Sequence, residues 1–196
     1  NKGDLNTGDG VTILAQQADE HGNVQAFNSV RIVSGRSKVV LADSKQVNAD
    51  NILWGFRGGE LDVNGNDLIF NRIRATDYGA ILNNSSSQTA NITFNSDKKN
   101  YIFHGKIEGN IDLFNEAPLA YEDQNFILDG SLELENNQFT KENGALVFQG
   151  HAISHAIGSD KKATYLTQED WEDRSFKLKQ LNLINTDFTL GRNATL

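Results

Sequence analysis

The sequence predicts an all-β chain in which short strands stack into a solenoid. Apolar and polar residues alternate over short runs, as in Leu61-Asp62-Val63, and this period of two is typical of strands. Glycine and asparagine, which accept the left-handed backbone conformations of sharp corners, separate the runs. The single proline, Pro118, lies outside every run, as strands that form a hydrogen-bonded ladder require.

Strands are expected wherever this alternation recurs. After the corner Asn64-Gly65-Asn66, for example, Leu68 and Phe70 return to the apolar side of the backbone. The expected strands are, in order, Val11–Ala15, Ala26–Val33, Lys38–Ala42, Ile52–Arg57, Glu60–Val63, Asp67–Ile73, Ala80–Leu82, Asn91–Asn95, Tyr101–Gly105, Asn125–Leu128, Ser131–Glu135, Ala145–Gln149, Thr164–Thr167, Ser175–Leu178, Leu181–Ile184 and Asp187–Leu190.

The same alternation predicts which side chains point into the coil, because successive residues of a strand face opposite sides. The apolar members of each run are expected inside, and the polar members between them outside. Expected inside are Leu61, Val63, Leu68, Phe70, Leu132, Leu134, Leu146, Phe148, Leu181 and Leu183, and expected outside are Asp62, Glu133, Glu135 and Asn182.

A repeat supports the coil over its main structural rival, an antiparallel sandwich built from hairpins, which alternation alone also fits. Phe126, Leu146, Leu166 and Phe188 recur at separations of 20, 20 and 22 residues. Intervals of this length are typical of solenoids. Asparagine-rich single turns and the ordered succession of matching strands also favour the coil.

One stretch interrupts the pattern. The range 97–125 contains Pro118 and the acidic run Tyr121-Glu122-Asp123, and it is expected to be a loop or a small insertion. The chain therefore divides into rungs at 1–96, this loop at 97–125, and rungs at 126–196 that continue the same solenoid.

Composition excludes several classes of function. The formal net charge is −8, with 18 basic and 26 acidic residues, and no cluster of Lys and Arg forms the positive stripe that nucleic acids require. The chain has no cysteine, so thiol catalysis and thiolate metal sites are absent. No apolar stretch approaches the roughly 20 residues that span a bilayer.

No catalytic constellation emerges from the motifs. Nucleophilic catalysis needs a serine, a histidine and a carboxylate that converge in space. His21, His104, His151 and His155 are available, but Gly-Asp-Ser-Gly and Gly-x-Ser-x-Gly are both missing, and Gly158-Ser159-Asp160 has a different order. We therefore expect no catalytic residues in this chain.

Metal and cofactor sites are not expected either. His151 and His155 have the spacing that places two ligands on one face of a helix, but no third ligand is near and the residues between them lead out of a strand. The segment 62–67 resembles a calcium-binding loop only superficially, because its glycine is fourth rather than sixth and position twelve is Ile73.

Carboxylates leave a glycan-cleaving function open. Glu133 and Glu135 alternate with leucines and are expected on the outer face of one strand. Cleavage of a polysaccharide would need such acids in a groove with basic or aromatic companions. Aromatic residues that could stack on a sugar are few, namely Trp54, Tyr78, Tyr121, Tyr165 and Trp171.

Several sequence motifs resemble those of a known family. The segments Gly10-Val-Thr-Ile-Leu-Ala-Gln-Gln-Ala-Asp, Gln25-Ala-Phe-Asn-Ser-Val-Arg-Ile-Val-Ser-Gly-Arg, Gly55-Phe-Arg-Gly-Gly, Asn143-Gly-Ala-Leu-Val-Phe-Gln-Gly-His and Asp170-Trp-Glu-Asp-Arg occur in the order found in the passenger of IgA1-protease-like serine protease autotransporters. The resemblance covers about Gly10–Asn84 and Phe126–Leu196, and it is poor across Asp97–Asn125.

The resemblance implies a right-handed parallel β-helix, which in that family carries a secreted trypsin-like protease and is followed by an outer-membrane barrel. The chain would then be a non-catalytic stalk segment, secreted or at the surface of a Gram-negative bacterium, whose partners are the protease domain and the barrel of its own polypeptide. Two alternatives remain: a self-associating or adhesive surface that contacts host proteins, and a glycan-active β-helix enzyme.

Overall fold

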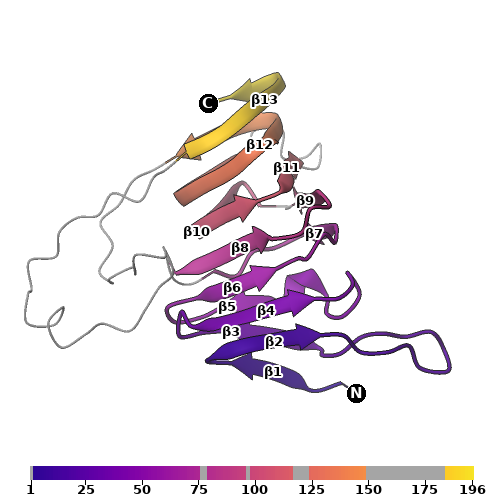
Figure 1. Ribbon diagram of the computed structural model, residues 1–196. Coiled ribbons are helices and arrows are strands. Elements are labelled where there is room, and N and C mark those ends of the chain that lie inside the picture. Colours follow the sequence, from indigo (N-terminus) through magenta and orange to yellow (C-terminus); the bar gives the residue numbers. More distant parts are fainter. Residues whose placement is uncertain (1, 76–78, 96–97, 117–123, 149–183) are drawn as a thin grey trace, which may run out of the picture.

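The computed structural model describes residues 2–75, 79–95, 98–116, 124–148 and 184–196, without the side chains of Asp129, Glu135 and Asn136. These residues form a column of stacked strands (Figure 1). The strands are β1 Asp4–Thr7, β2 Gly10–Leu14, β3 Ser29–Ile32, β4 Ser37–Leu41, β5 Ile52–Trp54, β6 Gly59–Asp62, β7 Leu68–Phe70, β8 Ala80–Asn84, β9 Ala90–Asn95, β10 Asn100–Gly109, β11 Ile111–Glu116, β12 Asn125–Phe148 and β13 Ile184–Thr195, and a 3-10 turn η1 covers Ala49–Asn51.

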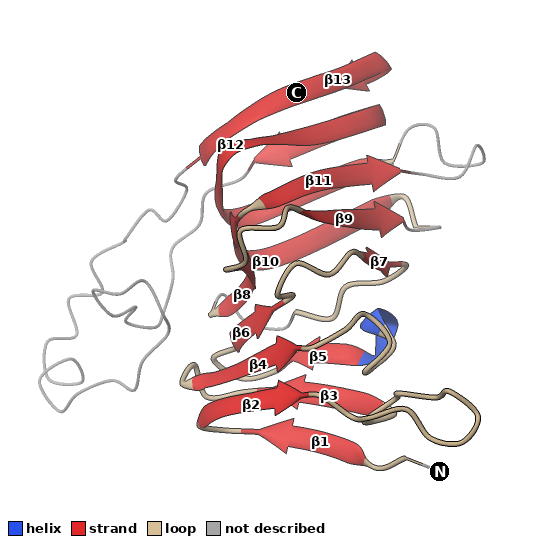
Figure 2. Cartoon of the chain, turned by 45° about the vertical axis from the view of Figure 1, so that its right-hand side comes forward, coloured by secondary structure: helices blue, strands red, loops and turns tan. Residues whose placement is uncertain are grey.

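Every strand pairing in the described part of the chain is parallel, which excludes the hairpin sandwich and confirms the solenoid. We call the ladder β1–β3–β5 face A, the ladder β2–β4–β6–β8–β10 with the first half of β12 face B, and the ladder β7–β9–β11 with the second half of β12 and β13 face C. Figure 2 shows these ladders rising side by side from the N-terminal end. The right-handed sense of the coil stays a prediction.

Inward side chains stack in columns because parallel pairing aligns equivalent positions of successive strands. In face B the column runs through all the paired strands from β4 to β12, and each of its members is fully buried: Val39, Leu61, Leu82, Ile107 and Leu132. Aromatic rings fill the centre of the coil. Trp54 and Phe103 meet edge to face with ring centroids 6.0 Å apart, and Phe94 and Phe126 stack at 5.4 Å.

Asparagine side chains form a second column at the corner between faces B and C. Asn84 accepts a hydrogen bond from the backbone N–H of Gly65 (2.8 Å) and donates one to the carbonyl of Asn110 (2.8 Å). Asn137 donates to the side chain of Asn110 (3.2 Å), and Asn64 reaches down to the carbonyl of Leu41 (3.1 Å). The corner asparagines predicted from the sequence therefore tie successive rungs together as well as turning the chain.

The burial predicted from alternation is confirmed at most positions that the structure describes. The apolar residues expected inside are buried, except that Phe148 is only partly buried, and Leu181, Leu183 and Asn182 lie outside the described residues. Asp62 points to the outer side of the coil as expected, where it pairs with Lys38, but it is not exposed to solvent, since its exposed fraction is 1%. Its carboxylate is held by hydrogen bonds from Ser85 in the next rung (Oγ to Oδ2, 2.5 Å) and from the backbone of Asn64 (3.0 Å).

The expectation of a loop at 97–125 is also wrong over the residues described there. This range contains β10, which pairs with β8 and β12, and β11, which pairs with β9 and β12. Tyr101, Phe103 and Ile107 point into the core on this rung. Alternation continues through Gly105, which has a backbone φ of 108° and takes an inward position where an apolar side chain would otherwise mark the strand.

The predicted repeat register is wrong as well. Phe126 and Leu146 lie in the same strand, β12, and so do not occupy equivalent positions of successive rungs. Phe126 instead pairs with Tyr101, and Phe139 pairs with Phe188. Rung length varies, since Ser29 follows its partner Asp4 by 25 residues whereas Ala75 follows its partner Trp54 by 21.

We predict that Gly105→Ala lowers the free energy of unfolding by about 2–4 kcal/mol. An added Cβ at Gly105 would overlap the carbonyl oxygen of Ala80, and its positive φ disfavours any L side chain. Gly8 is the matched control, because a Cβ there meets nothing within 4 Å, and Gly8→Ala should change stability by only about 0.5 kcal/mol. Urea melts measure both, and equal midpoints for the two variants would contradict the assignment of Gly105 to a closed corner.

Candidate functional site

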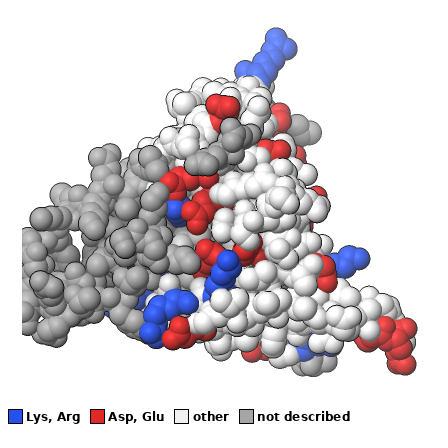
Figure 3. Space-filling model, viewed as in Figure 1, with Lys and Arg blue, Asp and Glu red and all other residues white. Residues whose placement is uncertain are grey.

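Charged side chains gather on the outer surface of face B, which makes this surface the first candidate site. Figure 3 shows acidic and basic atoms side by side over the strands of this face. The ammonium of Lys38 on β4 lies 2.9 Å from Oε2 of Glu60 and 3.2 Å from Oδ2 of Asp62, both on β6. The Glu60 and Asp62 side chains are only 5% and 2% exposed. Two carboxylates therefore share one lysine in a nearly dry setting.

The pKa directions favour the charged forms of Asp62 and Lys38. Burial acts to raise the pKa of Asp62, but hydrogen bonds from Ser85, Asn64 and Lys38 outweigh it and hold that pKa below its ordinary value. Burial likewise acts to lower the pKa of Lys38, and the pairing with Glu60 and Asp62 outweighs it, so that this pKa is raised. A glycosidase needs one carboxylic acid with a raised pKa as proton donor. Asp62 has the opposite shift and does not fit that role.

A second charged cluster follows two rungs later on the same face. Lys106 on β10 lies 2.6 Å from Glu108 and also pairs with Glu133 on β12. The Lys106 and Glu133 side chains are only 12% and 15% exposed, so Glu133 faces outward as expected but is not fully exposed. The pair of Lys106 with Glu133 links adjacent strands, as cross-strand pairs of opposite charge do, whereas the pair with Glu108 lies within β10.

The interior contains one lysine that sequence reasoning missed. Lys141 on β12 points into the core on face C, and its exposed fraction is 0%. Its ammonium donates to Oδ1 of Asn115 (2.6 Å) and to the carbonyl of Gln124 (3.1 Å). Asn115 in turn donates to the carbonyl of Phe94 (3.1 Å). Burial lowers the pKa of Lys141 to about 8.

Most of the serine and histidine residues weighed for catalysis and metal binding cannot be placed. His151, His155, Ser154 and Ser159 lie outside the described residues. The oxygens of Asp62, the first residue of the calcium-like segment, are occupied by Ser85, Asn64 and Lys38. Among the residues that the structure describes, no group of three or more His, Asp or Glu could hold a metal ion.

Comparison with known proteins gives consistent matches along the whole chain. Residues 118–196 match the family described as the PIC/HAP1/IgA0 second beta-solenoid repeat region. The chain is 35% identical to the serine protease SepA autotransporter of Shigella flexneri, over 100% of this chain and 20% of that protein. It is 33% identical to the adhesion and penetration protein autotransporter of Haemophilus influenzae, over 100% of this chain and 16% of that protein.

Solved structures agree with the sequence matches. The Haemophilus influenzae Hap adhesin superposes with a TM-score of 0.74 and 28% identity, over 97% of this chain and 24% of that one. The passenger domain of plasmid encoded toxin from enteroaggregative Escherichia coli gives a TM-score of 0.65 and 30% identity, over 86% of this chain and 18% of that one. The chain matches the β-helical passenger region of serine protease autotransporters.

These matches show what share of a longer protein the chain corresponds to, and where such proteins are found. The chain spans about a fifth or less of the length of the curated relatives named above. Passengers of autotransporters are displayed on or released from the bacterial surface, so the matched region is extracellular. No helix in the described part of the chain is long and apolar enough to cross a membrane.

A structural role accounts for the charged clusters of face B better than a catalytic role does. Lys38 and Lys106 each pair with carboxylates on a neighbouring strand, which ties rungs together on the outside of the coil. Sequence inspection could not find these pairs, because Lys38 and Glu60 are separated by a whole rung and become neighbours only through the register of β4 and β6.

We predict that stability rises with pH through the titration of Lys141. Between about pH 8 and 10.5 the folded chain holds this amine neutral while the unfolded chain keeps it protonated. The unfolded state then binds more protons, so raising the pH favours the folded state. From pH 7 to about pH 10 the gain should be on the order of 2–3 kcal/mol.

The measurement is a series of urea melts of the wild type and of Lys141→Met, which fills the same space without a charge. The difference between the two proteins removes the contributions of Lys38 and Lys106, which titrate at higher pH because their pKa values are raised. If the free energy of unfolding changed with pH in the same way for the two proteins over this range, Lys141 would not be held in a dry interior.

Proposed function

We propose that this chain is a non-catalytic stalk segment of a secreted serine protease autotransporter passenger, which presents a protease domain that lies outside these 196 residues. The observation that carries the proposal is the unbroken parallel ladder from β2 through β12 to β13. In such a solenoid each rung contacts only its neighbours, so length and direction are set by stacking alone. A spacer needs these two properties and no reactive group.

The chemistry of the described residues supports a structural role. Ser85 donates its hydroxyl hydrogen to Asp62 at 2.5 Å, but the lowered pKa of Asp62 makes this carboxylate a weak base, and the neighbouring Lys38 is held charged. The proposed partners are the protease domain and the outer-membrane barrel of the same polypeptide, with no nucleic acid and no cofactor. Relatives named as serine proteases support protease activity for the whole protein.

The stalk proposal predicts that removing one whole rung is tolerated in the full-length protein. Deletion of residues 81–105 joins Ala80 to Lys106, which already occupies the register position of Ile81 in the next rung. The inward column and both neighbouring ladders are then restored, one rung shorter. Export, surface display and protease activity should therefore stay within about twofold of the wild type.

A shorter deletion is the control. Removing residues 81–93 takes away fewer residues but leaves half a rung, so β8 is lost and the inward alternation no longer meets its partners. Export of folded passenger should fall sharply. The proposal fails if the whole-rung deletion is as damaging as the half-rung deletion, because a site within residues 81–105 would then be required in its own right.

The isolated chain should also carry no nucleophile. Incubation with a fluorescent organophosphate should label no serine in a saturable, time-dependent way, whereas the full-length protein should be labelled once. Saturable labelling of a single serine in the 196-residue chain would show that it holds its own catalytic centre.

A further inference from the structure

A surface cavity of about 530 Å³ lies where faces A and B meet, outside the charged clusters already described. It is lined by Asn6, Arg31, Val33, Ser34, Phe56 and Arg57. These residues come from β1, from β3 and the turn after it, and from the turn after β5, so three successive rungs build the walls. The cavity combines a guanidinium group, an amide and an aromatic ring in a protein whose net charge is −8.

The backbone around the cavity is held in a costly conformation. Ser34 and Arg57 adopt φ values of 74° and 64°, in the left-handed region that non-glycine residues seldom occupy. Stacking of the two turns enforces this, because the N–H of Ser34 donates to the carbonyl of Phe56 (2.8 Å) and that of Gly35 to the carbonyl of Gly58 (3.0 Å). Such conformations cluster at binding sites, where surrounding structure holds them in place.

Arg31 supplies the charge of the cavity. It is exposed on the outer side of β3, and no carboxylate among the described residues pairs with it. Its guanidinium lies over Gly55, because a Cβ on that glycine would come within 3.0 Å of Arg31 Nε and 2.7 Å of Val33 Cγ1. The missing side chain at Gly55 is therefore what leaves room for the guanidinium of Arg31, which lines the cavity.

An exposed aromatic ring also lines the cavity. Phe56 is 60% exposed and is the one aromatic ring among the exposed large hydrophobic residues that the structure describes. The guanidinium of Arg57 lies 5.0 Å from the centre of this ring, within the range of a cation–π contact. The cavity thus offers a donor fork for a carboxylate and an apolar surface for a ring.

We propose that this cavity binds a carboxylate-bearing sugar, a sialic acid or a hexuronic acid, carried on an extracellular glycan. The carboxylate would pair with the guanidinium of Arg31, which fits a planar anion through two donors. The hydroxyl groups would meet the amide of Asn6, and the apolar face of the ring would lie against Phe56 and Val33.

An acidic peptide fits the same site less well. Extended peptides are usually bound by adding a strand to a free sheet edge, and both edges of β3 are already occupied by β1 and β5. A compact ring with one carboxylate needs no free edge. The proposal is independent of the stalk function, since a stalk segment with or without a sugar site would stack in the same way.

The test is a titration of the 196-residue chain with the methyl glycosides of N-acetylneuraminic acid and of glucuronic acid, followed by NMR chemical shifts. Methyl galactoside, which lacks the carboxylate, is the neutral control ligand. Saturable shifts are expected for at least one acidic sugar and not for galactoside, and the two acidic arms identify which sugar is preferred. Arg31→Gln should weaken binding roughly tenfold, or about 1.4 kcal/mol.

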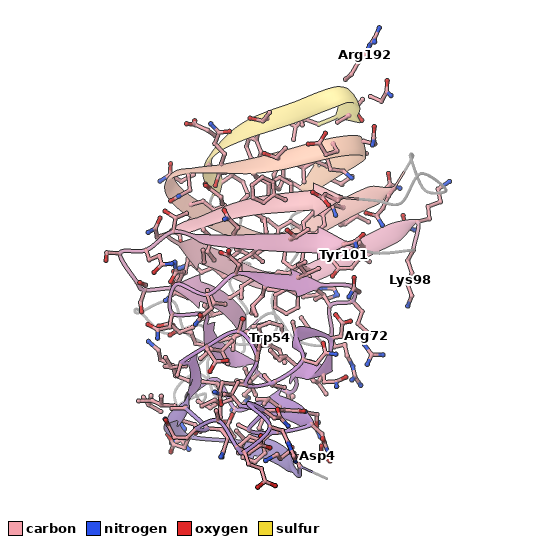
Figure 4. All side chains as sticks on the ribbon, turned by 90° about the vertical axis from the view of Figure 1, so that its right-hand side faces the viewer. Asp4, Trp54, Arg72, Lys98, Tyr101 and Arg192 are labelled. Carbon is pink, nitrogen blue, oxygen red and sulfur yellow. The ribbon has the colours of Figure 1, made fainter. Side chains whose placement is uncertain are left out.

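Matched variants separate the site from general charge effects. Arg72→Gln removes an exposed arginine at another corner (Figure 4) and should leave the affinity unchanged. Gly55→Ala should weaken binding by displacing Arg31, with circular dichroism used to verify the fold. The proposal is overturned if no acidic sugar saturates, if Arg31→Gln binds as tightly as the wild type, or if an acidic peptide binds at the cavity and the sugars do not.

Discussion

The parallel hydrogen-bonded ladder between successive rungs is the constraint on which the rest of this structure depends. Once β6 is laid on β4 with Leu61 opposite Val39, the inward and outward faces of every later strand on that side are determined. The core columns, the asparagine corner and the outer ion pairs all follow from the same alignment. A shift of one residue would turn the whole inward column to solvent.

Alternation in the sequence was enough to predict the architecture and most of the core. Leu61, Val63 and Leu134 are buried as their period-two pattern indicates, because that pattern is a local property of one strand. Asp62 was assigned to the wrong environment, since its burial depends on Ser85, 23 residues further along the chain. In the next rung only Tyr101–Gly105 was expected as a strand, whereas β10 continues to Gly109 and β11 follows it, because Gly105 stands at an inward position without an apolar side chain.

The candidate sites were harder to predict from the sequence than the fold was. Lys38 and Glu60, or Arg31 and Phe56, have no special spacing along the chain and are joined only by the register of the coil. Lys141 is a further case. Its neighbours Thr140 and Glu142 predict a lysine in solvent, and only the structure shows that Asn115 and Gln124 accept hydrogen bonds from it in the interior. Signals of this kind require the length of each rung, and between the described partner strands up to β12 rung length varies from 21 to 27 residues.

Uneven pairing along the column has a mechanical consequence. Hydrogen bonds between rungs run along the axis of the coil, so a pull on the two ends loads every junction between rungs with the same force. At the junction between β10 and β12 the force is spread over the paired residues Asn100–Glu108. The junction that joins β3 to β5 and β4 to β6 is shorter. On β3 only Val30–Ile32 are paired there, and the pairing of β4 with β6 is equally short. Tension would therefore open the column near its N-terminal end first, while the aromatic-rich rungs beyond it stay closed.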